Sequence, residues 1–198
     1  MQRKLILLGC YTSIASGILL MLGHLTNLLS GESVLGSTFV FFAHLLLVFA
    51  FVGLFVFQGD QNETDGFLAL LFGIIGNTLV TAVIFVEIAQ AAGEKAGAVL
   101  TAPVIKPMAD FGPLLFVLGI ILLGISIIRG KVLPKIAGYF LVGGTLIFAV
   151  ASMVPTGSLI IELVGSIFTG AGFIIAGLKG LKPGIGKLTE HGNTTENL

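Results

Sequence analysis

Long apolar stretches alternate with short polar ones along the whole chain. Six stretches cover residues 5–28, 38–57, 67–91, 111–128, 136–153 and 158–178. A helix rises about 1.5 Å per residue, so about 20 apolar residues cross a hydrocarbon core about 30 Å thick. Strands of a membrane barrel instead alternate apolar and polar residues over about ten positions. The pattern therefore predicts an all-α fold, a bundle of six transmembrane helices.

The connecting segments contain residues that end helices. Residues 58–66 are polar, and residues 129–135 are short and basic, with Gly130 and Pro134 suited to a helix end and a helix start. The longest connection, residues 92–110, contains Pro103 and Pro107, and we expect it to cap one side of the bundle. We expect one transmembrane domain over residues 1–178 and a mobile polar tail over residues 179–198.

The composition agrees with a membrane protein. Hydrophobic residues make up 56% of the chain and charged residues 10%, whereas a soluble domain has about 25% charged residues. The single cysteine, Cys10, excludes an internal disulfide and a cysteine-rich zinc site. We expect the lipid bilayer as the surroundings of this chain and no nucleic acid as a partner.

The basic residues predict the orientation in the membrane. Eight of the ten lysines and arginines fall in segments on the same side as the N-terminus: Arg3, Lys4, Arg129, Lys131, Lys135, Lys179, Lys182 and Lys187. Only Lys95 and Lys106 fall on the other side. Because basic loops stay in the cytoplasm, both termini are predicted to be cytoplasmic.

Glycine is unusually frequent, with 28 residues in the chain. Small residues allow helix backbones to approach closely in lipid. We expect glycines such as Gly143 and Gly170 to pack helices together within the bundle. Contact between copies of the chain through glycine-rich helix faces is the alternative.

Four ionisable residues lie inside the apolar stretches: His24, His44, Glu87 and Glu162. A charged side chain at the bilayer centre costs at least about 2.5–3.5 kcal/mol, so such residues suggest a function. Each lies four to six residues from the outer end of its stretch, which is roughly 6–9 Å at about 1.5 Å per residue. We therefore expect His24, His44 and Glu87 to converge in the outer half of the bundle.

Several uses fit these residues. His24, His44, Glu87 and Glu162 form a mixed nitrogen and oxygen ligand set for a divalent metal ion. His24 and His44 also fit the axial positions of a haem. A small transporter or channel, with Glu87, Glu162 and Asn77 along its path, is the second class. A structural or accessory subunit, in which histidine and glutamate pair to fix helix rotation, is the third.

No sequence motif assigns a reaction, because HExxH, GxSxG and a phosphate-binding loop are all missing. Short pieces do resemble a diffuse group of small, uncharacterised bacterial membrane proteins with six helices. These pieces are Gly23-His24, Ala43-His44-Leu45-Leu46, Glu87 and the run RGKVLPKIAG at residues 129–138. The resemblance covers about the first 140 residues. It implies a prokaryotic cytoplasmic membrane and adds no activity.

Overall fold

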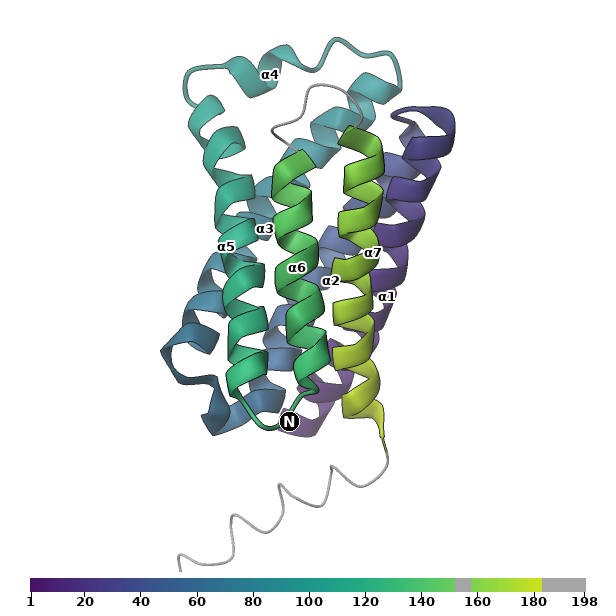
Figure 1. The fold of residues 1–198 in the computed structure, drawn as a ribbon. Helices are drawn as coiled ribbons and strands as arrows, with labels where there is room; N and C mark the ends of the chain where they lie inside the picture. Colours follow the sequence, from purple (N-terminus) through teal and green to yellow (C-terminus); the bar gives the residue numbers. More distant parts are fainter. Residues whose placement is uncertain (152–157, 183–198) are drawn as a thin grey trace, which may run out of the picture.

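The computed structural model describes residues 1–151 and 158–182, apart from the side chain of Glu63, and these residues form helices without any strand. The all-α prediction is confirmed for this part of the chain. A one-turn 3-10 helix, η1 (Gly59–Asn62), and a short α4 (Ala98–Thr101) lie between longer helices. The six long helices are α1 (Gln2–Ser30), α2 (Val34–Gln58), α3 (Glu63–Ala91), α5 (Lys106–Arg129), α6 (Lys135–Ala151) and α7 (Ser158–Leu181) (Figure 1).

Five of the long helices are long and apolar enough to cross a membrane, namely α1, α2, α3, α5 and α7. The sixth helix, α6, is apolar but has only 17 described residues. The span predicted over residues 136–153 runs past Ala151 into residues that the structure does not describe. Five of the six predicted spans are thus supported by length and hydropathy.

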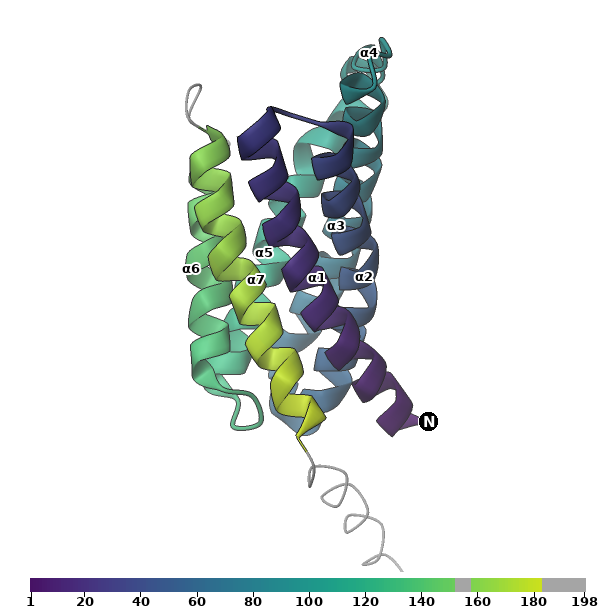
Figure 2. The same cartoon turned by 90° about the vertical axis from the view of Figure 1, so that its right-hand side faces the viewer.

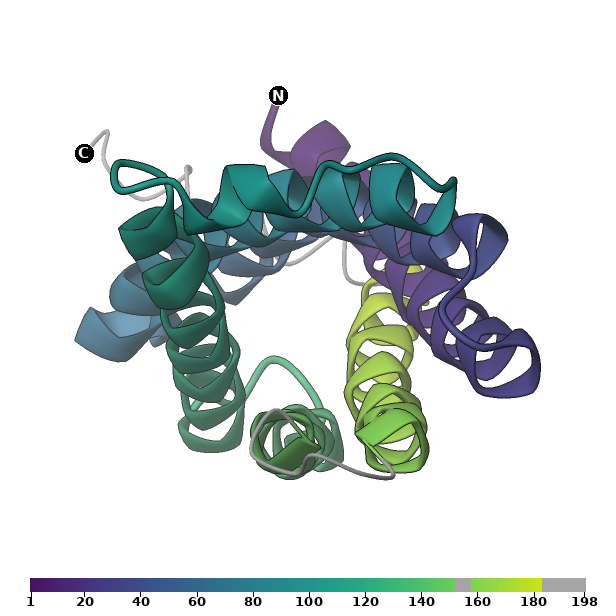
Figure 3. The ribbon, with the colours of Figure 1, turned by 90° about the horizontal axis from the view of Figure 1, so that it is seen from above.

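The six long helices form a closed ring in the order α1, α2, α3, α5, α6, α7, and α7 packs back on α1 (Figure 3). The N-terminus, the connection between α5 and α6 and the end of α7 lie at one end of the ring, here called the basic end (Figure 1). The segment with α4 lies at the opposite end, here called the α4 end (Figure 2). Short connections between antiparallel helices favour this neighbour-to-neighbour order.

Glycines allow the close approach of neighbouring helices around this ring. Facing pairs are Gly9 with Gly53, Gly17 with Gly170, Gly73 with Gly119, Gly124 with Gly138, and Gly144 with Gly165. A methyl group added to Gly170 would lie 2.6 Å from the backbone oxygen of Gly17, closer than real carbon atoms come. The packing prediction therefore holds for Gly170.

The same prediction is wrong for Gly143. A methyl group on Gly143 would meet no atom within 4 Å, whereas its neighbour Gly144 packs against Gly165 and Thr169 of α7. Successive helical residues point in directions about 100° apart, so a shift of one position changes which residue faces the neighbouring helix. The sequence predicted a glycine contact on α6 but not the residue that makes it.

Candidate ligand-binding pocket

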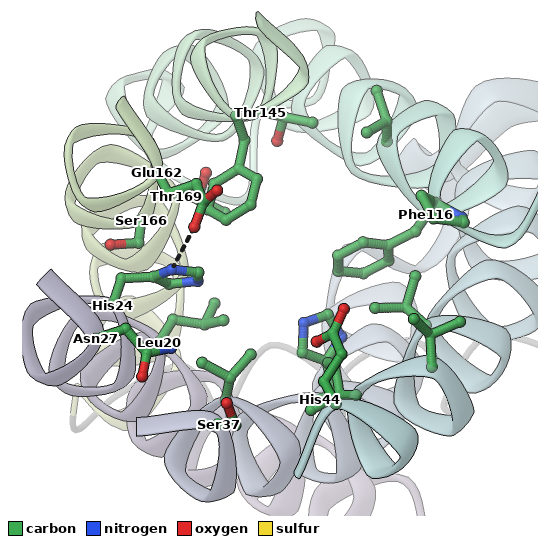
Figure 4. A pocket seen from close by; sticks show the side chains of 18 of the residues that line it. Leu20, His24, Asn27, Ser37, His44, Phe116, Thr145, Glu162, Ser166 and Thr169 are labelled. Carbon is green, nitrogen blue, oxygen red and sulfur yellow. Dashed lines mark ion pairs between the residues drawn. The ribbon is translucent and has the colours of Figure 1, made fainter. Parts of the chain in front are cut away.

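A cavity of about 320 Å³ lies inside the ring toward the α4 end, and residues from all six long helices line it (Figure 4). His24, His44, Glu87 and Glu162 are all among the lining residues. The structure thus brings together His24, His44 and Glu87, which the sequence analysis expects to converge. Their similar depth in three neighbouring helices placed them at one level of the bundle.

A side chain that the sequence analysis did not select, Glu32, also lines the pocket, from the tight connection between α1 and α2. Helix α1 ends at Ser30 and is followed by Gly31, whose φ of 75° is accessible to glycine at little cost. The side-chain oxygen of Asn27 accepts hydrogen bonds from the backbone nitrogen of Ser33 (3.1 Å) and from its hydroxyl (3.2 Å). The Ser33 hydroxyl in turn accepts from the backbone nitrogen of Gly36 and caps α2. These bonds fix the connection and keep Glu32 at the pocket.

His24 lies next to Glu162 on the wall formed by α1 and α7. The distance from Nδ1 of His24 to Oε2 of Glu162 is 3.6 Å, which suits an ion pair but is too long for a hydrogen bond. The imidazole also packs edge-on against the ring of Phe148, with centroids 4.8 Å apart. His24 is only 8% exposed, and its Nδ1 has no hydrogen-bond partner among the described residues. The ring is positioned mainly by packing, so it can still bond to a ligand.

His44 is held by two hydrogen bonds to Asn77 of α3. The amide nitrogen of Asn77 donates to the backbone oxygen of His44 at 2.7 Å, and the amide oxygen lies 2.8 Å from Nδ1 of His44. A carbonyl oxygen only accepts, so the amide nitrogen must face it and the amide oxygen must face the ring. Nδ1 of His44 therefore carries the proton and donates. In the neutral ring, Nε2 is then an acceptor.

Asn77 therefore has a different place from the one predicted for it. It is 0% exposed and lies behind the wall, outside the set of residues that line the cavity. Glu87 and Glu162 do line the cavity, whereas Asn77 does not, and the transporter or channel function stays a prediction. Asn77 acts on the pocket through His44.

The charge of the pocket is acidic. Its lining includes the carboxylates of Glu32, Glu87 and Glu162 and, within the described chain, no lysine or arginine. Glu87 lies close enough to Glu32 and Glu162 for their charges to interact. The hydroxyls of Thr145 and Thr169 also belong to the lining, and both are buried without a hydrogen-bond partner among the described residues. Buried polar groups normally have partners, so these hydroxyls are available to a ligand.

Much of the remaining wall is apolar, although Asn27, Ser37 and Ser166 also line the cavity. Val40, Val80, Ile84, Val117 and Leu159 are among the apolar lining residues. Toward the basic end, the rings of Phe51 and Phe173 are almost fully buried, with centroids 6.2 Å apart, and fill the middle of the bundle. These two rings thus pack between the cavity and the basic end.

The predicted four-residue metal site is not supported. Among residues 1–151 and 158–182, no three histidine, cysteine, aspartate or glutamate side chains are grouped closely enough to hold a metal ion. The physical reason is that His44 turns one ring nitrogen to Asn77, while His24 faces Glu162 from another wall (Figure 4). The hypothesis of His24 and His44 as haem ligands stays a prediction.

Comparison with known proteins finds no matching family model, no similar curated protein and no similar solved structure. The resemblance to small bacterial membrane proteins therefore stays an expectation from short motifs. The function has to be argued from the geometry and charge of the pocket.

Proposed function

We propose that the chain is a six-span protein of a prokaryotic cytoplasmic membrane, with both termini on the cytoplasmic side. Five helices have the length and hydropathy for this, and α6 completes the ring between α5 and α7. The 17 described residues of α6 cover about 26 Å at about 1.5 Å per residue, nearly the thickness of the hydrocarbon core. Arg129, Lys131 and Lys135 at the basic end favour the cytoplasm for that end.

The outer surface of the ring supports this placement. Large apolar side chains are exposed on several helices, among them Phe42, Phe49, Phe67, Phe85 and Ile75. Soluble monomers rarely expose contiguous apolar patches of more than a few hundred Å². Lipid is the solvent that suits such a surface, and in this orientation the pocket lies in the outer half of the membrane.

We propose that the pocket binds a small organic cation with an apolar body. The observation that carries this proposal is a lining with three glutamates and no lysine or arginine within the described chain. Clefts with one sign of charge and low-dielectric walls concentrate ligands of the opposite sign. The valine, isoleucine and phenylalanine side chains of the wall suit an alkyl group, and about 320 Å³ is near the lower end of typical small-molecule pockets.

An organic cation fits the arrangement better than a bare divalent ion does. A metal ion needs several ligand atoms about 2.0–2.2 Å away, and the side chains of this pocket are not grouped for that. An amine instead spreads its contacts over separate side chains. Among the described residues, the packed rings of Phe51 and Phe173 lie between the cavity and the basic end, which supports binding over conduction.

The test uses three ligands with the same four-carbon body on purified protein in detergent: n-butylammonium, 1-butanol and butanoate. We expect n-butylammonium to raise the melting temperature in proportion to the logarithm of its concentration, and the other two to have no effect. Equal effects of all three ligands would show that charge does not govern binding. A rise with Zn²⁺ alone, or a haem absorption band, would replace the proposal with a metal or haem function.

A further inference from the structure

The two ring nitrogens of His44 have different surroundings. Nδ1 of His44 faces Asn77, which lies outside the cavity lining, whereas His44 itself lines the cavity. The two ring nitrogens lie on different edges of the imidazole, so Nε2 is directed toward the cavity side. No residue in the described parts of the chain donates a hydrogen bond to Nε2. The pocket thus contains a fixed acceptor.

The other polar side chains of the pocket include three carboxylates, together with groups that can donate, namely His24, Asn27, Ser37 and Ser166. When they are ionised, the carboxylates of Glu32, Glu87 and Glu162 only accept hydrogen bonds. The hydroxyls of Thr145 and Thr169 can either donate or accept. A ligand that binds both the carboxylates and Nε2 of His44 must bring hydrogen-bond donors together with its positive charge. A primary ammonium brings three N–H groups, a secondary ammonium two and a quaternary ammonium none.

Building on the proposed function, we infer that the pocket selects primary or secondary ammonium ligands, with Nε2 of His44 accepting one N–H. Asn77 is the positioning residue, because its two hydrogen bonds hold the imidazole in the tautomer that accepts. A second acceptor for the same ammonium comes from the glutamates. Hydrogen bonds between charged donors and well-placed acceptors are the strong ones, so the selectivity follows from the N–H count.

The aromatic side chains of the pocket do not form the alternative kind of site. Quaternary ammonium groups are recognised by several aromatic faces around the cation. The rings of Phe116 and Phe148 line the cavity, but each packs against a histidine, with centroids 4.9 Å and 4.8 Å apart. The pocket therefore offers acceptors where a quaternary ammonium would need aromatic faces.

Isothermal titration calorimetry of the full chain in detergent compares n-butylammonium with N,N,N-trimethylbutylammonium, which has the same charge and alkyl chain. We expect the primary ammonium to bind about tenfold tighter or more, the ratio that one hydrogen bond to a charged group gives. If the quaternary ligand binds equally well or better, the inference is wrong although the proposed function survives. If neither ligand binds, the proposed function itself fails.

The role of Asn77 is tested by the Asn77→Leu variant, with Ser126→Ala as the control. Ser126 is a buried hydroxyl nearer the basic end, and it donates to Gln58 at 3.4 Å. We expect Asn77→Leu to reduce the preference for the primary ammonium to about threefold or less, because the imidazole loses its fixed tautomer. Ser126→Ala should keep the full preference. An unchanged preference in Asn77→Leu would contradict the positioning role.

Nitrogen-15 NMR of histidine-labelled protein gives a further readout that is measured on the parent chain. The chain has three histidines, so a His44→Phe spectrum identifies the His44 signals by their loss. We expect Nδ1 of His44 to carry the proton and Nε2 to shift when n-butylammonium binds but not when the trimethyl ligand binds. A proton on Nε2 in the free protein, or no shift on binding, would overturn the assignment.

Discussion

A methyl group at a single glycine tests whether backbone contact holds the ring together. In Gly170→Ala the new carbon would lie 2.6 Å from the backbone oxygen of Gly17 and 2.9 Å from the end of Met21. The Met21 side chain can move, but the Gly17 oxygen belongs to α1, so the two helices must separate. Overpacking of this kind costs about 1–3 kcal/mol. For a chain of 198 residues that corresponds to a melting temperature lower by about 2–12 °C.

Gly143→Ala is the matched control, because the same methyl group there meets nothing within 4 Å. Replacing glycine by alanine within a helix even favours the folded state slightly, by about 0.5–1 kcal/mol in water. Thermal unfolding in one detergent, followed by circular dichroism, should therefore show Gly170→Ala clearly below the parent and Gly143→Ala at or above it. Equal melting temperatures for the two variants would refute the role of backbone contact between α1 and α7.

Four further results are expected. Asn77→Leu should destabilise the protein by about 1–3 kcal/mol in thermal unfolding, because the backbone oxygen of His44 loses its partner; no loss would argue against that bond. Phe51→Ala should cost about 3–5 kcal/mol through the cavity it leaves, and a near-neutral effect would mean that the middle of the bundle is loosely packed. Cys10 is fully buried, so maleimide should label it only after unfolding; rapid labelling of native protein would contradict this. An impermeant maleimide on intact cells should label Lys95→Cys but not Lys131→Cys, and the reverse pattern would invert the topology.

The course of the helices could be predicted from the sequence because hydropathy changes sharply at the ends of each stretch. The predicted and the observed helix ends differ mainly where a helix continues past its apolar part into polar residues. Helix α5 begins at Lys106, not at residue 111, since Pro107 is compatible with the first turn of a helix. Helix α3 begins at Glu63, not at residue 67, which brings Asp65 into the helix and within 3.5 Å of Arg129. A charged helix end gives no hydrophobic signal.

The depth of the candidate site along the helices could be predicted from the sequence, but the contacts of its side chains could not. Depth along neighbouring helices was enough to expect His24, His44 and Glu87 in one place. Two other features depend on three-dimensional contacts that residue spacing does not contain. Glu32 reaches the pocket because hydrogen bonds fix a tight connection, and Asn77 lies behind His44 instead of along a path. The metal hypothesis is not supported among the described residues for the same reason, since lining one cavity does not bring side chains to ligating distance.

The central claim, that the acidic lining binds an organic cation, is tested most directly by calorimetry on two variants that lose the same charge. Glu87 lines the pocket, whereas Asp110 lies outside the lining toward the same end, half exposed and 2.8 Å from Lys106. For n-butylammonium we predict a dissociation constant about tenfold or more higher in Glu87→Gln, since a hydrogen bond between charged groups is lost. Asp110→Asn should bind like the parent. Equal weakening in both variants, or no weakening in Glu87→Gln, would contradict the claim that the pocket carboxylates bind the ligand.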